Sequence, residues 1–271
     1  MAETDKKVAV ISGATSGIGK LLAEKFRADG YVVCNLARSC DGEDDNYKCD
    51  VSDEAQVNAA VEKIAEKYGH VDILVNNAGV GISGATELLP IADIKKVIDV
   101  SYFGALYLTR ACLKYMGAGA RIIFMSSISA LTVTPFHSVY CSAKAAEQML
   151  GLSLRMELSH TGIEVVCICP GEIRTEFSAN KLVHTETSER YGERVRKAYE
   201  LAVSRNGKRM DPEKIIGKIY KICVRGKKAM YIIGGKYKAF YRLKKLTSEN
   251  FFLNMTNKFA SGGLHKPPKK Q

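Results

Sequence analysis

The stretch VAVISGATSGIG, residues 8–19, decides the fold of this chain. Its first half is apolar and rich in β-branched side chains, which indicates a buried strand. Glycines follow at Gly13, Gly17 and Gly19, and the residues from Gly17 onward have the periodicity of a helix. A glycine-rich turn between a strand and a helix lets the backbone approach a pyrophosphate, whose charge the helix N-terminus stabilises. The stretch therefore predicts a phosphate cradle in the first strand–helix–strand unit.

Outward from this unit, strand and helix patterns alternate along most of the chain. The strand patterns cover residues 7–12, 31–37, 47–50, 71–76, 120–126, 163–169 and 230–233, and the helical patterns cover 17–29, 53–68, 90–116, 139–161 and 212–224. Such alternation predicts parallel strands joined by crossover helices. We expect one α/β domain over residues 1–234, a Rossmann-type doubly wound parallel sheet of about seven strands with helices on both faces. A basic, aromatic extension, residues 235–271, follows it.

The composition excludes several classes of protein. The chain has 271 residues, of which 46% are hydrophobic and 25% charged, an ordinary balance for a globular protein. No window approaches the run of about 20 apolar residues that spans a bilayer, and we see no signal peptide at the N-terminus. The eight cysteines include no Cys-x-x-Cys pair, so we expect reduced thiols in a cytoplasmic protein without a metal site.

The positive charge of the chain is concentrated at one end. The formal net charge is +11, and residues 225–271 alone contain 12 Lys and Arg against a single acid, Glu249. The rest of the chain is neutral overall. An enzyme that acts on nucleic acid more often spreads positive charge over its main binding face, so we expect no nucleic-acid partner.

The end of the second predicted strand indicates which dinucleotide the cradle prefers. A cofactor with a free ribose 2′-hydroxyl is usually bound by an Asp or Glu about 20 residues beyond the glycine turn. This chain instead has Ala37, Arg38 and Ser39 at that place. A missing acid and a neighbouring guanidinium favour a 2′-phosphate, so we predict NADP(H) rather than NAD(H).

Tyr140 and Lys144 supply a candidate acid–base pair. Four residues apart on a predicted helix, the two side chains share one face. We expect the ammonium to lower the pKa of Tyr140 from its reference value near 10, so that the phenol exchanges protons at neutral pH. Ser127 stands at the carboxyl end of the preceding buried strand, where ligands bind in open sheets. A second Tyr-x-x-x-Lys pair, Tyr241 and Lys245, lies in the basic extension and is interpreted as coincidental.

Several motifs, taken in their order, resemble the short-chain dehydrogenase/reductase family. They are Gly13-x-x-x-Gly17-Ile18-Gly19, Asn76-Asn77-Ala78-Gly79, Ser127, Tyr140-x-x-x-Lys144, and Pro170-Gly171 followed by Thr175. The resemblance covers most of the predicted domain and is nearest to the hydroxysteroid and retinol dehydrogenase branch. It implies a nicotinamide-dependent oxidoreductase in which the cofactor supplies the hydride and the protein supplies orientation and electrostatics.

The resemblance also implies a role for each matching residue. Tyr140 would transfer a proton to or from the substrate oxygen, and Ser127 would hydrogen-bond that oxygen. Lys144 would bind the nicotinamide ribose, Asp50 would contact the adenine, and residues 170–175 would wrap the nicotinamide carboxamide. The implied cofactor-binding set is Gly13, Thr15, Ser16, Gly17, Ile18, Gly19, Arg38, Ser39, Asp50, Val51, Asn77, Ala78, Gly79, Tyr140, Lys144, Pro170, Gly171, Ile173 and Thr175.

One position departs from the family pattern. Family members usually have an Asn three residues before the glycine that matches Gly104, where it helps hold a proton-relay water, and this chain has Ser101. A serine still offers one donor and two lone pairs to a water molecule. We therefore include Ser101 in the catalytic set, through a modified relay. The other interpretation, a catalytically silent NADP(H)-binding protein, stays open.

Residues 176–210 form a polar insertion after the sixth predicted strand, at the edge where open α/β sheets shape their substrate site. His137 precedes the Tyr140 helix and is interpreted as a solvated loop residue rather than a lining of the substrate mouth. Phe136, Phe177 and Met210 either contact an apolar substrate or pack in the core, and the sequence leaves both open.

The C-terminal extension is amphipathic. On a helix, Tyr237, Phe240, Tyr241 and Lys244 share one stripe, and Phe251, Phe252, Met255 and Phe259 form a second. Such a segment lies on an anionic bilayer surface, or packs against the core or a second subunit, and we favour packing. The family resemblance implies a homodimer or homotetramer. We expect residues 261–271 to be a disordered tip.

The function that these patterns favour is the interconversion of a secondary alcohol and a ketone with NADP(H). The apolar extension and the long insertion point to a bulky apolar substrate, with a hydroxysteroid or bile acid first. The alternatives are a retinoid or acyl-ketone lipid reductase at a membrane surface, and the silent cofactor-binding protein.

Overall fold

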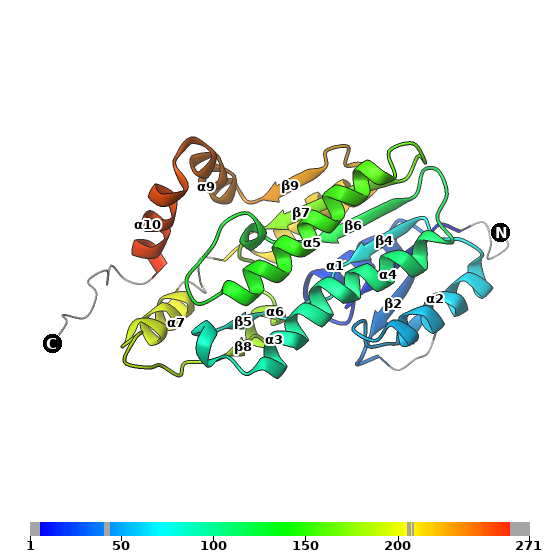
Figure 1. Cartoon of the computed structure of the whole chain (residues 1–271). Helices are drawn as coiled ribbons and strands as arrows, with labels where there is room; N and C mark the ends of the chain where they lie inside the picture. The colour runs from blue at the N-terminus through cyan, green and yellow to red at the C-terminus, as the bar shows by residue number, and fades with distance from the viewer. Residues whose placement is uncertain (1–5, 41–43, 205–206, 208, 261–271) are drawn as a thin grey trace.

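Seven parallel strands form the central sheet of the computed structural model, which describes residues 6–40, 44–204, 207 and 209–260 (Figure 1). The strand order is β3-β2-β1-β4-β6-β7-β9. The strands are β1 Val8–Ser12, β2 Val32–Ala37, β3 Asn46–Lys48, β4 Ile73–Asn76, β6 Arg121–Met125, β7 Glu164–Pro170 and β9 Met230–Ile233. The predicted sheet is confirmed, and no strand end differs from its predicted position by more than two residues. The expected tip, residues 261–271, lies outside the described residues.

The order of the strands reverses beside β1, which pairs with β2 on one side and with β4 on the other. Neighbouring strands of a doubly wound sheet leave a crevice at such a switch point, outside their carboxyl ends. The glycine turn follows β1, and Asn77 follows Asn76, the last residue of β4, so both predicted cofactor segments meet at this crevice.

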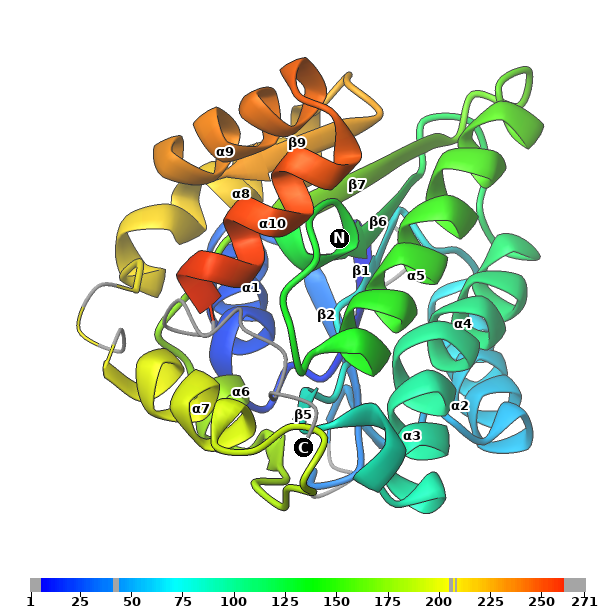
Figure 2. The same cartoon turned by 60° about the vertical axis from the view of Figure 1, so that its left-hand side comes forward.

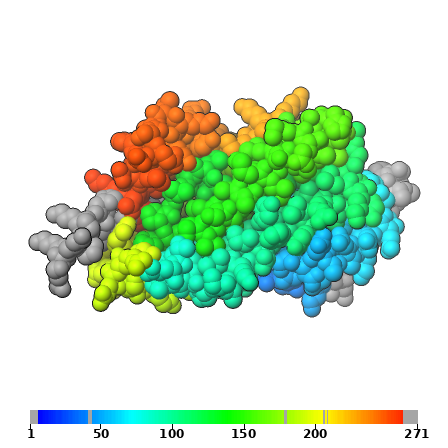
Figure 3. Space-filling view, in the orientation of Figure 1, coloured from blue at the N-terminus to red at the C-terminus, as the bar shows by residue number. Residues whose placement is uncertain are grey.

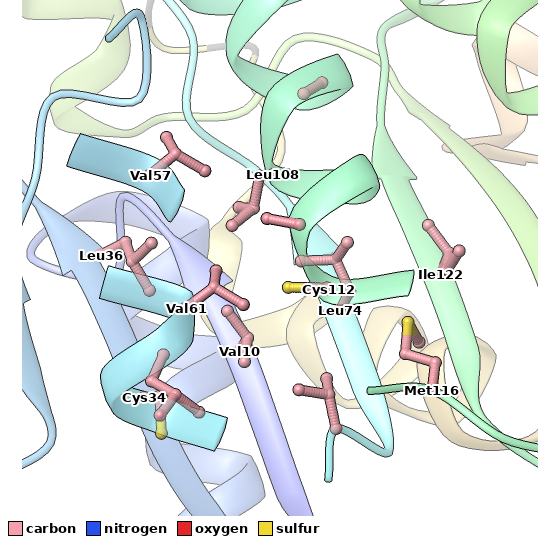
Figure 4. Packing of buried hydrophobic residues seen from close by; sticks show 14 of the residues in the cluster. Val10, Cys34, Leu36, Val57, Val61, Leu74, Leu108, Cys112, Met116 and Ile122 are labelled. Carbon is pink, nitrogen blue, oxygen red and sulfur yellow. The ribbon is translucent and has the colours of Figure 1, made fainter. Parts of the chain in front are cut away.

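Helices cover both faces of the sheet (Figures 1 and 2). On one face α2 Glu54–Tyr68, α4 Gly104–Leu113 and α5 Ser138–Glu157 bury apolar side chains against the strands. Figure 4 shows part of this core, where Val61 of α2 and Cys112 of α4 approach Val10 of β1. On the other face α1 Gly17–Ala28 packs beside α8 Pro212–Arg225. The strands are therefore buried on both sides, which is why their sequences are almost continuously apolar.

The helix predicted over residues 90–116 is confirmed over most of its length, but it contains a turn of different hydrogen bonding that was not predicted. The structure has α3 Ile91–Ile98, then a turn of π-helix at Asp99–Phe103, then α4. Gly104 begins α4 against Val51, where an added Cβ would lie 2.9 Å from the Val51 Cγ2. π-helical turns inside α-helices are frequent at functional sites, and this one contains Ser101.

The insertion and the C-terminal extension both lie at the end of the sheet to which the strands point (Figure 1). The insertion contains α6 Glu176–Ala179, β8 Leu182–Val183 and α7 Arg194–Ser204, and β8 pairs with β5 Ile82–Ser83 in a small second sheet. The extension forms α9 Gly235–Leu246 and α10 Glu249–Ala260. Figure 3 shows α10 and α7 gathered at the same end of the molecule. Two short 3₁₀ turns, Thr86–Leu88 and Ile128–Ala130, complete the described elements.

Candidate active site

The glycine turn has the shape that a phosphate requires. Gly13 has a φ of +69°, a conformation that L side chains rarely adopt. A Cβ on Gly19 would lie 2.3 Å from the Gly13 carbonyl oxygen, so only glycine allows α1 to begin this close to the turn. The N-cap residue Ser16 makes no side-chain cap, and the first turn of α1 contains no acid. Its N–H groups are left for an anion, which fits the pyrophosphate of a dinucleotide.

Two side-chain amides, of the buried Asn35 and the half-buried Asn77, hold this turn in place. The Asn35 Oδ1 accepts a hydrogen bond from the Ala14 N–H at 2.9 Å, which ties the turn to β2. The Asn77 Nδ2 donates to the carbonyl oxygens of Ser12, at 2.9 Å, and Gly13, at 3.2 Å. The Asn77 side chain thus supports the cradle from behind, while Ala78 and Gly79 follow it into the crevice.

The structure places the predicted ribose and adenine residues around the end of β2. Arg38 and Ser39 are exposed immediately after Ala37, the last residue of that strand. The Asp50 Oδ1 accepts hydrogen bonds from the Ser52 N–H and hydroxyl. Val51 is buried against Gly104.

The segment after β7 returns to the glycine turn. A Cβ on Gly17 would lie 3.4 Å from the Cβ of Thr175, so these two predicted cofactor residues are neighbours. Ile173 is buried and forms a parallel bridge with Met210. Gly171, which follows Pro170, lies directly beneath the ring of Tyr237 from α9. The C-terminal extension thus packs on the segment that was predicted to wrap the nicotinamide.

The predicted catalytic side chains come together at the carboxyl edge of the sheet. Tyr140 and Lys144 share the sheet-facing side of α5, and Ser127 follows β6 and hydrogen-bonds with Tyr140. The Lys144 ammonium is buried and donates to the Met125 carbonyl oxygen at 2.9 Å and to the Glu147 Oε2 at 2.7 Å. This arrangement holds a phenol, a hydroxyl and a cation together on one side of the crevice.

The expected low pKa of Tyr140 is wrong for the closed site that the structure shows. Burial raises the pKa of Tyr140 above 10.0, and it outweighs Lys144 and Ser127, which both lower it. Glu147 also raises the pKa because its carboxylate offsets the nearby ammonium. The spacing of Tyr140 and Lys144 in the sequence reveals the cation, but it reveals neither the desolvation of the phenol nor the second charge.

Ser101 lies inside the π-helical turn and is fully buried. Its Oγ has no hydrogen-bond partner among the described residues. The position that a Gly79 Cβ would take lies 3.7 Å from this Oγ and 3.5 Å from the Lys144 Nζ. Ser101 therefore faces the same small space as the ammonium.

The insertion closes over Tyr140 from the other side. The Phe177 ring of α6 tilts over the phenol with 5.9 Å between ring centroids. The Lys181 Nζ lies 2.5 Å from the His137 Nε2. The interpretation of His137 as a solvated loop residue is wrong: burial, with Lys181 beside it, lowers its pKa to about 4, so the imidazole is neutral and accepts from Lys181. Phe136 packs edge-on against Tyr191 of the same insertion.

The sequence analysis missed four residues of this site: Ser12, Asn35, Glu147 and Lys181. Asn35 lies in an apolar strand, and Glu147 lies on the buried face of α5. In each case a polar residue stands where the pattern predicts an apolar one, and this could have marked both residues as candidates. The Ser12 Oγ accepts from the Asn77 N–H at 3.0 Å. No local pattern pointed to Lys181, because its partner is 44 residues away.

The C-terminal helices are built largely as packing elements. On α9 the first predicted stripe is less exposed than the other positions, and Phe240 contacts Phe252 with 4.8 Å between ring centroids. The second stripe is wrong as a single face: Phe252 is fully buried, whereas Phe251 is 55% and Phe259 66% exposed. Inward-facing positions of α10 are instead Phe252, Thr256 and Ala260.

A cavity of about 560 Å³ lies between α10, the loop after β6 and the start of α5. Ser138 and Cys141, which flank Tyr140 in the sequence, line one wall, and Leu253 and Thr256 line another. The Thr256 Oγ1 is buried and has no partner among the described residues. No helix within the described ranges is long and apolar enough to cross a membrane.

A phosphate cradle at the switch point of a parallel sheet, facing a Ser–Tyr–Lys group, defines a dinucleotide-binding oxidoreductase. Comparison with known proteins agrees. Residues 7–186 match the family model described as short chain dehydrogenase. The chain belongs to the short-chain dehydrogenase family.

Two curated relatives and three solved structures illustrate the similarity. Dehydrogenase/reductase SDR family member 7B of Rattus norvegicus is 35% identical over 206 residues, 68% of this chain and 63% of that protein, so the match spans less than two thirds of its length. 3-Ketodihydrosphingosine reductase of Bacteroides thetaiotaomicron is 29% identical over 226 residues, 81% of this chain and 84% of that protein. A short-chain dehydrogenase from Streptomyces avermitilis has a TM-score of 0.77 at 27% identity and covers 89% of this chain and 93% of its own.

The other two structures contain cofactors. A short-chain dehydrogenase/reductase from Burkholderia phymatum in complex with NAD has a TM-score of 0.75 at 26% identity, covering 91% and 95% of the two chains. ElxO with NADP bound has a TM-score of 0.69 at 26% identity, covering 86% and 99%. Structural neighbours thus include both NAD-bound and NADP-bound proteins, and the choice between the two cofactors rests on this chain's own residues.

Proposed function

We propose that this protein is an NADP(H)-dependent oxidoreductase that interconverts a secondary alcohol and a ketone on a bulky apolar substrate. The observation that carries the proposal is that Tyr140, which is partly buried, lies with the buried Ser127 and Lys144 at the carboxyl edge of the sheet, across from the glycine turn. A phenol beside a buried ammonium is suited to proton transfer at an alcohol or carbonyl oxygen.

The residues divide the work of ketone reduction as follows. Tyr140 donates its proton to the substrate oxygen, and the Ser127 hydroxyl donates a hydrogen bond to that oxygen as negative charge develops. The Lys144 ammonium stabilises the phenolate that remains, which then regains a proton from solvent. A bound nicotinamide supplies the hydride to the carbonyl carbon, or accepts it in the oxidation direction.

The residues at the end of β2 support the preference for NADP(H). Arg38 is exposed directly after the last residue of this strand, where its guanidinium has room to bind a 2′-phosphate. Asp45, one of the acids that follow this strand, accepts hydrogen bonds from Lys67 and Tyr68 and is therefore already engaged. These observations support a site that accepts a phosphate rather than a free hydroxyl.

The proposed substrate is a hydroxysteroid or bile acid, with a retinoid or acyl-ketone lipid as the alternative. Phe177 over Tyr140 supports an apolar surface at the reacting oxygen. The cavity beside the start of α5 is lined by none of Ser127, Tyr140 and Lys144, so the support for an apolar substrate comes from Phe177 and not from this cavity. Of the two relatives described above, only 3-ketodihydrosphingosine reductase has a substrate in its name, so an assay is needed to decide the substrate of this chain.

The alternative at a membrane surface has its own support. Leu246 is 84% exposed, and it lies with the exposed Phe251 and Phe259 on helices that also expose Lys245 and Lys258. A basic surface with protruding apolar side chains suits an anionic bilayer. We propose a cytoplasmic protein that contacts membranes through α9 and α10. Co-sedimentation with phosphatidylserine liposomes should fall on removal of residues 236–271, and unchanged binding would contradict the contact.

We also propose that the protein forms a homodimer or homotetramer through α4 and α5. Met149 and Met156 protrude from α5 with 60% and 71% of their surface exposed, and Phe103 precedes α4 with 37% exposed. Exposed apolar side chains on neighbouring helices suit a symmetric contact. Light scattering should give a mass that is a multiple of the 29.7 kDa chain, and Met156→Glu should reduce it.

The deciding experiment is a substrate screen. Purified protein is assayed for NADPH and NADH oxidation against ketosteroids, retinal, acyl-ketones and sugar ketones. Turnover of a ketosteroid supports the proposal, whereas turnover of small polar ketones alone overturns the substrate class. Tight NADPH binding without any turnover identifies the catalytically silent alternative, which the replacement of the family's usual Asn by Ser101 favours.

A further inference from the structure

Glu147 is a buried carboxylate on α5, three residues after Lys144. It is 1% exposed, and its Oε2 accepts a hydrogen bond from the Lys144 Nζ at 2.7 Å. A buried ion pair stabilises a fold no better than apolar side chains of similar volume, because both charges lose their hydration. A carboxylate at this place, bound to the ammonium that serves Tyr140, therefore suggests a role beyond stability.

Glu147 helps fix the position of the Lys144 ammonium. Two of the three N–H groups are directed to Met125 and Glu147. The ammonium also lies near the position of a Gly79 Cβ, which the Ser101 Oγ faces as well. Because the Ser101 hydroxyl makes no hydrogen bond among the described residues, it does not hold Lys144. The carboxylate and the Met125 carbonyl hold it instead.

Few titratable groups face Glu147. On its own helix they are Lys144 and Tyr140, and on β7 they are the thiols of Cys167 and Cys169. Burial raises the pKa of both thiols above 9.0, so they remain neutral near pH 7. Burial also raises the pKa of the Glu147 carboxyl to about 7, although Lys144 lowers it. Lys144 is thus the one cation in this described group, and Glu147 is its counter-charge.

We propose that Glu147 is a positioning residue that balances the Lys144 cation and thereby sets the pH at which Tyr140 changes from proton donor to proton acceptor. Its effect on turnover rests on the proposed function, whereas its effect on the titration of Tyr140 does not. With the carboxylate ionised, the ammonium attracts the phenolate less strongly, so the phenol keeps its proton. Above pH 7, where its carboxylate is ionised, Glu147 therefore favours the protonated phenol that ketone reduction requires.

The first experiment titrates Tyr140 directly, without a substrate. The ultraviolet absorbance of tyrosinate is followed with pH in the full-length protein, and the Tyr140→Phe curve in the same background is subtracted. Glu147→Gln keeps the shape of the side chain and removes its charge, so we expect the midpoint of Tyr140 to fall by about one pH unit. Glu147→Asp retains a charge farther from Lys144, so we expect a smaller fall. Glu157→Gln, at an exposed position of the same helix, should leave the midpoint unchanged.

An unchanged midpoint in Glu147→Gln would overturn the proposal. If that variant does not fold, as thermal unfolding would reveal, Glu147→Asp decides: a midpoint below the wild type supports the role, and a wild-type midpoint contradicts it. The second experiment measures the pH–rate profile of alcohol oxidation with a substrate found in the screen. The pH at which the rate rises should be lower in Glu147→Gln than in the wild type, in step with the titration midpoint of Tyr140.

The two proposals fail separately. A shifted midpoint in a protein that turns over no substrate would remove the proposed function and leave the role of Glu147 in place. If turnover depends on Tyr140 but Glu147→Gln and the wild type have the same titration midpoint and pH–rate profile, the role of Glu147 is contradicted and the proposed function stands.

Discussion

Replacing Gly19 by Ala tests the phosphate cradle against helix propensity. Alanine within a helix is favoured over glycine by about 1 kcal/mol. At Gly19, however, the new Cβ would lie 2.3 Å from the Gly13 carbonyl oxygen and 2.5 Å from the Asn77 Nδ2. Real Cβ contacts are essentially never closer than 3.0 Å, so the turn must move by about 0.7 Å or more. Overpacking of this kind costs roughly 1–3 kcal/mol, so after the gain in helix propensity we expect a net loss of up to about 2 kcal/mol.

The assay compares two helical glycines. A Cβ on Gly217, in α8, would meet no atom within 4 Å, so Gly217→Ala should raise the free energy of unfolding by about 1 kcal/mol. Urea unfolding measures both variants, and fluorescence titration measures their NADPH affinity. We expect Gly19→Ala to bind NADPH at least about tenfold more weakly, since a displaced turn withdraws its N–H groups. If Gly19→Ala is as stable as Gly217→Ala and binds NADPH with wild-type affinity, the reasoning about the cradle is refuted.

Three further outcomes are expected. Arg38→Asp should lower the ratio of NADPH to NADH affinity at least about tenfold in parallel titrations, because a carboxylate repels the 2′-phosphate; an unchanged ratio would place the phosphate elsewhere. His137 has a pKa near 4 in the folded state against 6.5 unfolded, so folding stability is lost as pH falls from 6.5 toward 4. Urea unfolding should show that this loss is smaller in His137→Gln, by on the order of 2 kcal/mol, and equal losses would count against a buried imidazole. Phe252→Ala should cost about 3–5 kcal/mol and Phe251→Ala less than about 1 kcal/mol, since only the former is buried; similar costs would contradict the assigned face of α10.

The sheet was predictable because its signal is local. Strands such as β4 and β6 are buried on both faces, and their short apolar runs are bounded by polar turns. The glycine turn was equally predictable, because the positive φ of Gly13 and the close backbone contact at Gly19 both require glycine. Position at the carboxyl end of a strand then brought Ser127 into the candidate site.

The features that the sequence did not reveal depend on which backbone groups pair within a helix, or on residues that lie far apart along the chain. The π-helical turn at Asp99–Phe103 has residues of ordinary helical type, so a continuous helix was the natural prediction. The neutral state of His137 is caused by burial and by Lys181, which reaches it from a separate loop. The raised pKa of Tyr140 likewise reflects desolvation and the compensating charge of Glu147, neither of which follows from a Tyr-x-x-x-Lys spacing.

The most direct measurement is the rate of hydride transfer in Tyr140→Phe, followed by NADPH absorbance in a single turnover with a ketone found in the screen. The change removes one hydroxyl and leaves the ring beneath Phe177, so NADPH affinity should stay at its wild-type value. We expect the rate to fall by about 100- to 10,000-fold, the usual contribution of a positioned proton donor. A variant that reduces the ketone as fast as the wild type would show that the proton comes from another group.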